Sequence, residues 1–164
     1  MATSGSSGVA ISVSVRDLGL GAQLQSMQRL LANMAPVYKA VGATLECNVN
    51  LRFDTKTDPD GSAWAPWAKR TAAARKREGR GTLLEYTGRM RDSLTYLADA
   101  QGVEVGFGLA YAKYPEQRTP GVGGLPRRAM LFGRNGRLSD SDLLDAMGAA
   151  KRAFKKQLNL QGTP

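Results

Sequence analysis

Histidine is absent from this 164-residue chain, and cysteine occurs once, at Cys47. The commonest general base and metal ligand of proteins is therefore missing. A single thiol can form neither an intrachain disulfide nor a thiolate zinc cluster. No run of eighteen apolar residues is present, so we expect no membrane span, and the N-terminus lacks the basic start and apolar segment of a signal peptide.

Motifs for phosphates and hard cations are also missing. The glycine-rich residues 121–124 lack the lysine and hydroxyl residue of a phosphate loop. Asp54, Asp58 and Asp60 are not followed in register by the glycine and glutamate of a calcium loop. We therefore predict no catalytic residue, no metal site and no cofactor. An enzyme that uses a pair of carboxylates, as glycoside hydrolases do, remains an open alternative, although nothing in the sequence selects such a pair.

Positive charge is in excess, with 23 basic against 14 acidic residues and a formal net charge of +9. A positive field favours anionic partners, such as nucleic acid, acidic protein surfaces or membrane headgroups. The excess is concentrated in residues 52–80 and 111–137, which both lack hydrophobic periodicity. Most of the basic residues of each segment form a cluster: Lys69, Arg70, Arg75, Lys76, Arg77 and Arg80 in the first segment, and Arg118, Arg127, Arg128, Arg134 and Arg137 in the second.

Apolar periodicity predicts an N-terminal strand followed by a long helix. Alternating residues over 9–15 are typical of a half-buried strand. From Leu20 to Leu45, apolar residues recur every three or four positions, which predicts a helix that Pro36 kinks or splits in two. We expect this helix to pack on the domain's own sheet, and a coiled-coil or ring-forming interface is the alternative. Cys47 lies beside the apolar stripe and is predicted to be buried.

The second half of the chain alternates between regular elements and loops. Helical spacing predicts a middle helix over 83–94, and a glycine-containing loop between residues 95–98 and 103–107 predicts a β-hairpin. Ser139 followed by Asp142 resembles a capping box and predicts the start of a C-terminal helix. One side of that helix carries Leu143, Leu144, Met147, Ala150, Phe154 and Leu158.

These elements predict an α+β fold in which an antiparallel sheet is packed by a long N-terminal helix, a middle helix and a C-terminal helix. We expect a flexible arm over 1–8 and a single domain over 9–160, with irregular loops at about 52–82 and 113–137. Thr71 to Arg80 is expected to form a short basic helix or to become ordered only on assembly. Trp64 and Trp67 either pin the first loop to the core or anchor a subunit contact.

A series of short signatures runs in order from Asp58 to Asp142. They are Asp58-Pro59-Asp60-Gly61-x-x-Trp64, Leu83-x-x-x-Thr87-Gly88-x-Met90-x-x-Ser93-Leu94, Val103-x-Val105-Gly106, Tyr111-Ala112, Pro126-x-Arg128-x-x-Leu131-x-Gly133 and Leu138-Ser139-Asp140-x-Asp142. In order and spacing the series resembles the phage virion morphogenesis family, the tail-completion proteins of the phage neck, over roughly residues 50–158. The chain departs from the family pattern where Lys113–Gln117 replaces a His-Gln-Gly-type segment.

The resemblance implies a small α+β domain and a role in assembly instead of catalysis. It implies a homo-oligomeric ring, most simply a hexamer, that completes the tail and joins it to the filled head. The partners would be other copies of the chain, neighbouring neck and tail-tube proteins, and DNA in the channel through non-specific contacts, with no membrane. The expected location is the virion neck or tail, and the host cytoplasm during assembly.

The alternative function is sequence-independent binding of nucleic acid through the basic loops, which needs no base-reading motif. None of the common DNA-reading modules is evident. Under either function, the loops are where contacts with partners are expected. The interface residues predicted from the sequence are Trp64, Trp67, Arg70, Arg75, Arg127 and Arg128.

Overall fold

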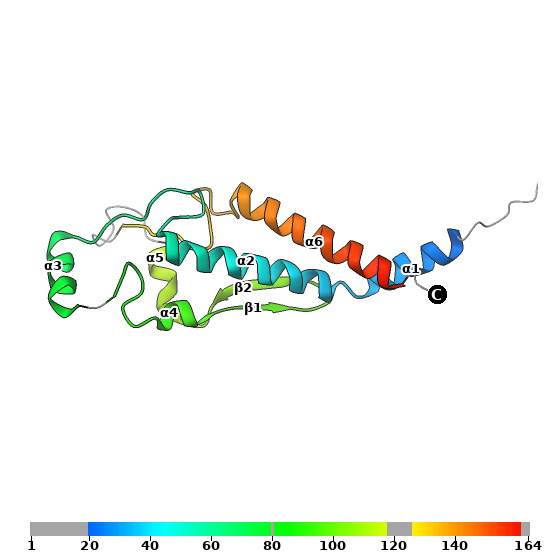
Figure 1. The fold of residues 1–164 in the computed structure, drawn as a ribbon, viewed down its shortest axis with the longest axis horizontal. Coiled ribbons are helices and arrows are strands. Elements are labelled where there is room, and N and C mark those ends of the chain that lie inside the picture. Colours follow the sequence, from blue (N-terminus) through cyan, green and yellow to red (C-terminus); the bar gives the residue numbers. More distant parts are fainter. Residues whose placement is uncertain (1–19, 80, 118–125, 162–164) are drawn as a thin grey trace, which may run out of the picture.

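The computed structural model describes residues 20–79, 81–117 and 126–161. The molecule is elongated, and helix α2 (Ala35–Thr55) forms its central layer, with a β-hairpin on one side and helix α6 (Asp140–Gln161) on the other (Figure 1). The predicted α+β class, with helices packed on an antiparallel sheet, is confirmed. The predicted arm over 1–8, the predicted strand over 9–15, Arg80 and Arg118 lie outside the described residues.

The predicted break at Pro36 is present. Helix α1 (Leu20–Ala32) ends three residues before α2 begins, and Pro36 lies in the first turn of α2, where a proline costs no hydrogen bond. Helix α2 continues to Thr55, so the residues from 52 onward that were predicted as loop begin inside a helix. Cys47 is exposed on α2, and the prediction that it is buried is wrong because Leu45 and Val49 face the core instead.

The predicted hairpin is confirmed as β1 (Leu94–Ala98) and β2 (Val103–Phe107), which are antiparallel and pair Leu94 with Phe107. Helix α2 lies close over this hairpin at Gly42. A Cβ atom added to Gly42 would come within 2.4 Å of Tyr96 Cδ2, so a larger side chain would push the helix off the sheet. This contact fixes the distance between the two layers.

The predicted middle helix over 83–94 is wrong except for its last turn. Helix α4 covers only Arg89–Asp92, and Leu94 already belongs to β1. Leu84 has a φ of 64° and Gly88 a φ of 77°, and left-handed residues at these two positions interrupt a right-handed helix. The helical spacing of the leucines reflects contacts with the core from a chain of turns, since Leu83 and Leu84 pack against it.

The C-terminal helix begins as predicted, because Ser139 Oγ accepts the backbone N–H of Asp142 at 3.2 Å. Its buried side differs from expectation. Asp142, Ala146 and Ala149 are buried, whereas Leu143, Leu144 and Met147 are exposed. The small alanine side chains allow α6 to pack closely on α2, and the large apolar residues consequently point away from the body.

The two predicted loops contain short helices. Helix α3 (Lys69–Glu78) lies at one end of the molecule, and the second segment holds the 3₁₀ turn η1 (Ala110–Ala112) and helix α5 (Lys113–Gln117) (Figure 1). Residues 126–137 are irregular, as predicted. Of the two expectations for Thr71 to Arg80, the structure shows a short basic helix up to Glu78.

The core lies where the C-terminal half of α2 meets the hairpin and the loops. Phe53 is fully buried and makes edge-to-face contacts with Trp64, at 5.6 Å between ring centroids, and with Phe107, at 6.1 Å. Such arrangements favour the positive ring edge against the negative ring face. The remaining buried members of the cluster are Val49, Met90, Leu94, Ala112 and Met130.

Candidate interaction surfaces

Trp64 is 5% exposed and fills the core, and its indole Nε1 donates a hydrogen bond to the Ala129 carbonyl at 2.9 Å. This bond ties the loop after α2 to the loop that precedes α6. Trp67, three residues later, is only half-buried. The position of Trp64 is therefore explained by its place in the core of one subunit. A subunit contact by Trp64 and Trp67 stays a prediction.

The guanidinium groups of Arg127 and Arg128 satisfy backbone carbonyls of the same subunit. Arg128 is 8% exposed and donates to the carbonyls of Ala65 at 2.7 Å and Pro66 at 2.9 Å. Burial lowers the pKa of Arg128 from its ordinary value. The half-buried Arg127 donates to the carbonyls of three other residues, Glu116, Phe132 and Gly133. These contacts hold irregular backbone in place, because carbonyls outside regular structure need donors when they are buried.

Glu116 accepts hydrogen bonds from backbone N–H groups, just as the two arginines donate to backbone carbonyls. Its carboxylate accepts the N–H groups of Met130 at 2.7 Å, Leu131 at 3.1 Å and Phe132 at 2.8 Å, and the residue is 9% exposed. Three consecutive amides around one carboxylate form a charge-assisted clamp. Residues 126–133 are thus fixed to α5 by Glu116.

Helix α3 has the opposite character, since none of its residues is buried. Arg70, Lys76 and Arg77 are exposed. Arg75 is held locally: its guanidinium carbon lies 3.8 Å from the centroid of the Tyr86 ring, and its Nη1 is 3.0 Å from Glu78 Oε2. Arg70 and Arg75 therefore lie on an outward-facing element, and their predicted role at an interface stays a prediction.

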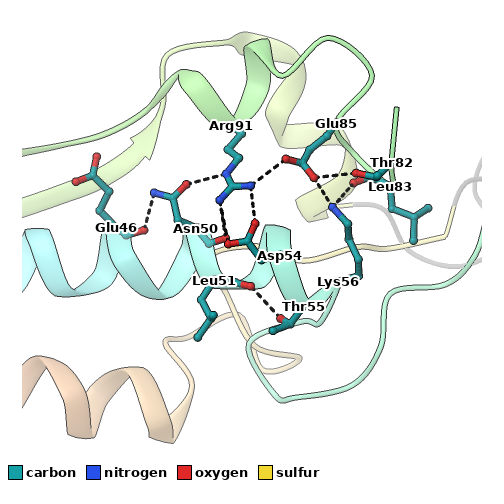
Figure 2. Close-up of polar contacts among 10 residues, drawn as sticks. All are labelled: Glu46, Asn50, Leu51, Asp54, Thr55, Lys56, Thr82, Leu83, Glu85 and Arg91. Carbon is teal, nitrogen blue, oxygen red and sulfur yellow. Dashed lines mark hydrogen bonds and ion pairs between the residues drawn. The ribbon is translucent and has the colours of Figure 1, made fainter. Parts of the chain in front are cut away.

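A surface network around Arg91 links α4 to the C-terminal half of α2 (Figure 2). Arg91 binds Asp54 with both terminal nitrogens, at 2.7 and 3.1 Å, and also contacts Glu85 at 3.1 Å. Hydrogen bonds to Asp54 and then to Glu85 raise the pKa of Arg91. Burial raises the pKa of Glu85, but hydrogen bonds from Lys56, Thr82 and Arg91 outweigh this effect and lower it below its ordinary value.

An open cleft of about 560 Å³ lies between the end of α2, the 58–61 turn and the start of α6. At its base, the buried Arg52 forms an ion pair with Oδ1 of Asp142 and donates to the Met130 carbonyl at 2.8 Å. Asn48 adds a second donor to Asp142 Oδ1 at 3.0 Å. We call this cleft the acidic cleft; its lining aspartates are Asp58, Asp60, Asp140, Asp142 and Asp145.

Within residues 20–79, 81–117 and 126–161, no group of three or more His, Cys, Asp or Glu side chains is arranged to hold a metal ion. No helix in these same segments combines the length and the hydropathy needed to cross a bilayer.

Comparison with known families decides the class of protein. The sequence profile of the phage virion morphogenesis family matches residues 16–114, which is more than half of the chain. The chain belongs to this family. Searches among curated proteins and among solved structures found no match. Membership in this family points to a structural role in phage assembly.

The span matched by the family includes α1 through η1, and so contains the two N-terminal helices, helix α3 and the hairpin. It ends at residue 114, before the Pro126–Gly133 and Leu138–Asp142 signatures. The family match therefore covers one wall of the acidic cleft, formed by α2 and the 58–61 turn, while α6 forms the other.

Exposed apolar side chains on two helices form further surfaces of this family member. On α6, Leu144 is 69% and Met147 60% exposed, and Leu143 lies next to them. On α1, Leu24, Met27 and Leu31 are between 45% and 64% exposed. Helix α1 lies beside the C-terminal end of α6, whereas Leu143, Leu144 and Met147 lie near its N-terminal end, so the two exposed apolar groups are separate surfaces (Figure 1). Exposed apolar helix faces of this kind mark interaction sites.

Sequence reasoning missed the most constrained polar residues. Arg52 was assigned to a loop, Glu116 was noted only as part of a divergent segment, and Asp142 was interpreted solely as a helix start. Their shared property is burial of a charge that has its partner 14 or more residues away. The sequence carries no local signal for such pairs, because the pairing depends on tertiary structure.

Proposed function

We propose that this protein completes the phage tail and joins it to the head as a ring, most simply a hexamer, in the neck. Family membership supports a structural role in phage assembly. The observation that carries the ring is the exposed apolar surface on α1 and α6, since side chains such as Leu144 and Leu31 are more than 60% exposed to water in the single chain. Burial against a neighbouring copy would gain about 25 cal/mol per Å² of apolar surface.

The neck position further requires contacts with different proteins above and below the ring. Helix α3 suits such a contact, because it extends beyond the α2, hairpin and α6 layers and has no buried residue (Figure 1). The partners are other copies of the chain, tail-tube proteins and neck proteins. In this function the protein acts by joining surfaces, and no bond is made or broken.

Sedimentation velocity and negative-stain microscopy of the purified chain test the ring. We expect a closed particle of several times the 17.6 kDa chain mass. The double variant Leu144→Asp/Met147→Asp is expected to shift the protein to monomer, because it places charge on the apolar surface. The matched control is Leu97→Asp on β1, at a residue that is 72% exposed but lies on the hairpin.

A monomer at every concentration, together with absence from purified virions, would contradict the proposal. Equal loss of assembly in the Leu97→Asp control would show that the α6 face is not special. Complementation of a phage lacking the gene separates tail completion from other assembly roles: tails without joined heads are expected for the α6 variant.

A second function, sequence-independent binding of nucleic acid, is favoured by the net charge of +9 and by the exposed cations of α3. Phosphate binding by lysine and arginine weakens steeply with salt. Fluorescence anisotropy with a labelled duplex is expected to show binding at about 50 mM salt and little at about 200 mM. No binding at the lower concentration removes this alternative.

A further inference from the structure

Helix α3 presents a regular face of positive charge. It contains five basic residues and one acidic residue, a formal charge of +4. Lys69 and Lys76 are seven residues apart, as are Arg70 and Arg77, and seven residues correspond to two helical turns, or about 10 Å. These four cations therefore share one face, while Arg75 is turned toward Tyr86.

The acidic cleft has the complementary charge. Its lining contains five aspartates and a single basic residue, Arg52, a formal charge of −4. Because Arg52 is buried and paired with Asp142, its charge is directed inward and not toward the opening. Asp140 and Asp145 are exposed at the cleft in the first turns of α6, and Asp145 Oδ2 also accepts a hydrogen bond from Asn48 at 3.0 Å.

A second observation concerns Asp142 at the base of the cleft. Asp142 is 1% exposed and lines the cleft, yet its Oδ2 atom has no hydrogen-bond partner. Arg52 and Asn48 both bond the other oxygen, Oδ1. Oδ2 therefore adds negative charge that no donor compensates at the base of the cleft, beneath the surface that a partner would contact.

We propose that helix α3 of one copy docks its Lys69, Arg70, Lys76 and Arg77 face into the acidic cleft of a neighbouring copy. The inference rests on the ring of the proposed function and names one of its contacts. A single helix face and a cleft on different parts of the same chain make a heterologous, head-to-tail contact, which closes a ring if the rotation between copies allows it.

Self-docking accounts for more of the structure than DNA binding does. A duplex would neutralise the cations of α3 but would leave the −4 cleft and the unpaired Asp142 oxygen without a partner. At about 100° per residue, Ala73 lies between the two pairs of cations on the same face of α3, and its small side chain allows the helix to approach the cleft walls. Such charge complementarity sets the register and rate of association.

Charge-reversal variants test the contact by sedimentation velocity. Lys76→Glu/Arg77→Glu on α3 and Asp140→Lys/Asp145→Lys on the cleft rim are each expected to weaken association at least tenfold. An equimolar mixture of the two is expected to assemble again, because each reversed surface meets a reversed partner. The control Lys39→Glu/Arg89→Glu makes the same charge change at exposed residues elsewhere and is expected to assemble normally.

Helix α6 begins at Asp140, so reversal there also opposes the helix dipole. The milder Asp140→Asn/Asp145→Asn variant keeps the fold testable, and circular dichroism confirms folding of every variant. Unimpaired assembly of the α3 variant, or no recovery in the mixture, overturns the inference. In both cases an assembling wild type leaves the ring itself standing, whereas a monomeric wild type overturns the ring and this contact together. Loss of duplex binding with intact assembly identifies α3 as a nucleic-acid arm and also overturns it.

Discussion

Helix α3 and residues 126–137 carry two groups of basic side chains, and the fold places them in opposite environments. Arg127 and Arg128 point inward and donate to five backbone carbonyls, whereas Lys76 and Arg77 extend into solvent. The difference follows from the backbone around each group. A helix satisfies its own carbonyls, so its arginines remain available, while irregular buried backbone requires arginine donors to hold it together.

The comparison indicates that basic residues in this chain serve two purposes, which depend on where the fold places them. Net charge alone assigns both segments to anionic partners, yet Arg127 and Arg128 are bound to carbonyls of the same subunit, whereas Lys76 and Arg77 of α3 are exposed. We expect the hydrogen bonds from Arg128 to the Ala65 and Pro66 carbonyls to contribute to stability, and the charge on α3 to contribute to the proposed association. Substitutions in residues 126–137 should therefore lower the free energy of unfolding, whereas substitutions on the exposed face of α3 should weaken assembly. The expected loss of stability decreases from residues 126–137 to α3.

Arg128→Glu should have the largest effect on folding. The substitution places a carboxylate against the Ala65 and Pro66 carbonyls at a site that is 8% exposed. We expect a loss of about 3–5 kcal/mol in the free energy of unfolding, because a buried charge is left without a compensating partner. Urea denaturation measures this loss. The exposed Arg77→Glu is the control, and equal stability of the two variants would contradict the inward role of Arg128.

This expectation also revises a prediction from the sequence. From the sequence alone, reversal of Arg127 and Arg128 should block tail joining while leaving the fold intact. Both guanidinium groups bond backbone within the same subunit, so we now expect the double variant to lose stability as well. A phage defect in this double variant would therefore report instability, and it is a poor test of an interface.

Glu116→Gln should have the next largest effect. The amide retains one oxygen but places an NH₂ group against a backbone N–H that now donates to the carboxylate. We expect a loss of about 2 kcal/mol, typical of a charge-assisted hydrogen bond in a buried site. Urea unfolding of Glu116→Gln beside the exposed Glu104→Gln provides the measurement. A shift of similar size in both variants would argue against the clamp.

How far the sequence predicts this fold depends on whether the determining interactions are local. Pro36, Ser139 and the loop around Gly102 act within a few residues, and the helix break, the helix start and the hairpin were all predicted. The residues 83–94 depend on left-handed positions such as Leu84, which no leucine pattern indicates. The same holds for α6, where Ala146 and Ala149 face α2 because the helices pack closely and the larger apolar residues are left outside.

The two candidate surfaces also differ in whether the sequence predicts them. Helix α3 was recognisable from its composition, because a run of basic residues with alanines needs no tertiary information to be charged and helical. The acidic cleft was not, since its aspartates come from 58–60 and 140–145 and meet only in the folded chain. Asp142 shows the point most clearly, because its pairing with Arg52 spans 90 positions in the sequence.

Acid should reduce the stability that the Arg91 network contributes, and this loss should be smaller than the loss caused by Arg128→Glu or Glu116→Gln. The folded-state pKa of Glu85 lies below its ordinary value of 4.5. Its contribution is therefore complete above that value and is lost as the pH falls through the folded-state pKa. We expect the stability difference between wild type and Glu85→Gln to shrink between about pH 7 and about pH 3. A difference that is constant with pH would show that Glu85 is not held as an anion.

Arg75→Ala should produce the smallest measurable loss and so sharpens the contrast within α3 itself. Arg75 stacks on Tyr86 at 3.8 Å and pairs with Glu78, and exposed contacts of these kinds are each worth about 0.5–1 kcal/mol or less. Arg77→Ala should leave the free energy of unfolding in urea unchanged. It should nevertheless weaken association between copies, because Arg77 lies on the face that we propose docks into the acidic cleft. Arg75→Ala should do the reverse. If the two variants behave alike in both measurements, then α3 has no distinct anchoring and docking faces.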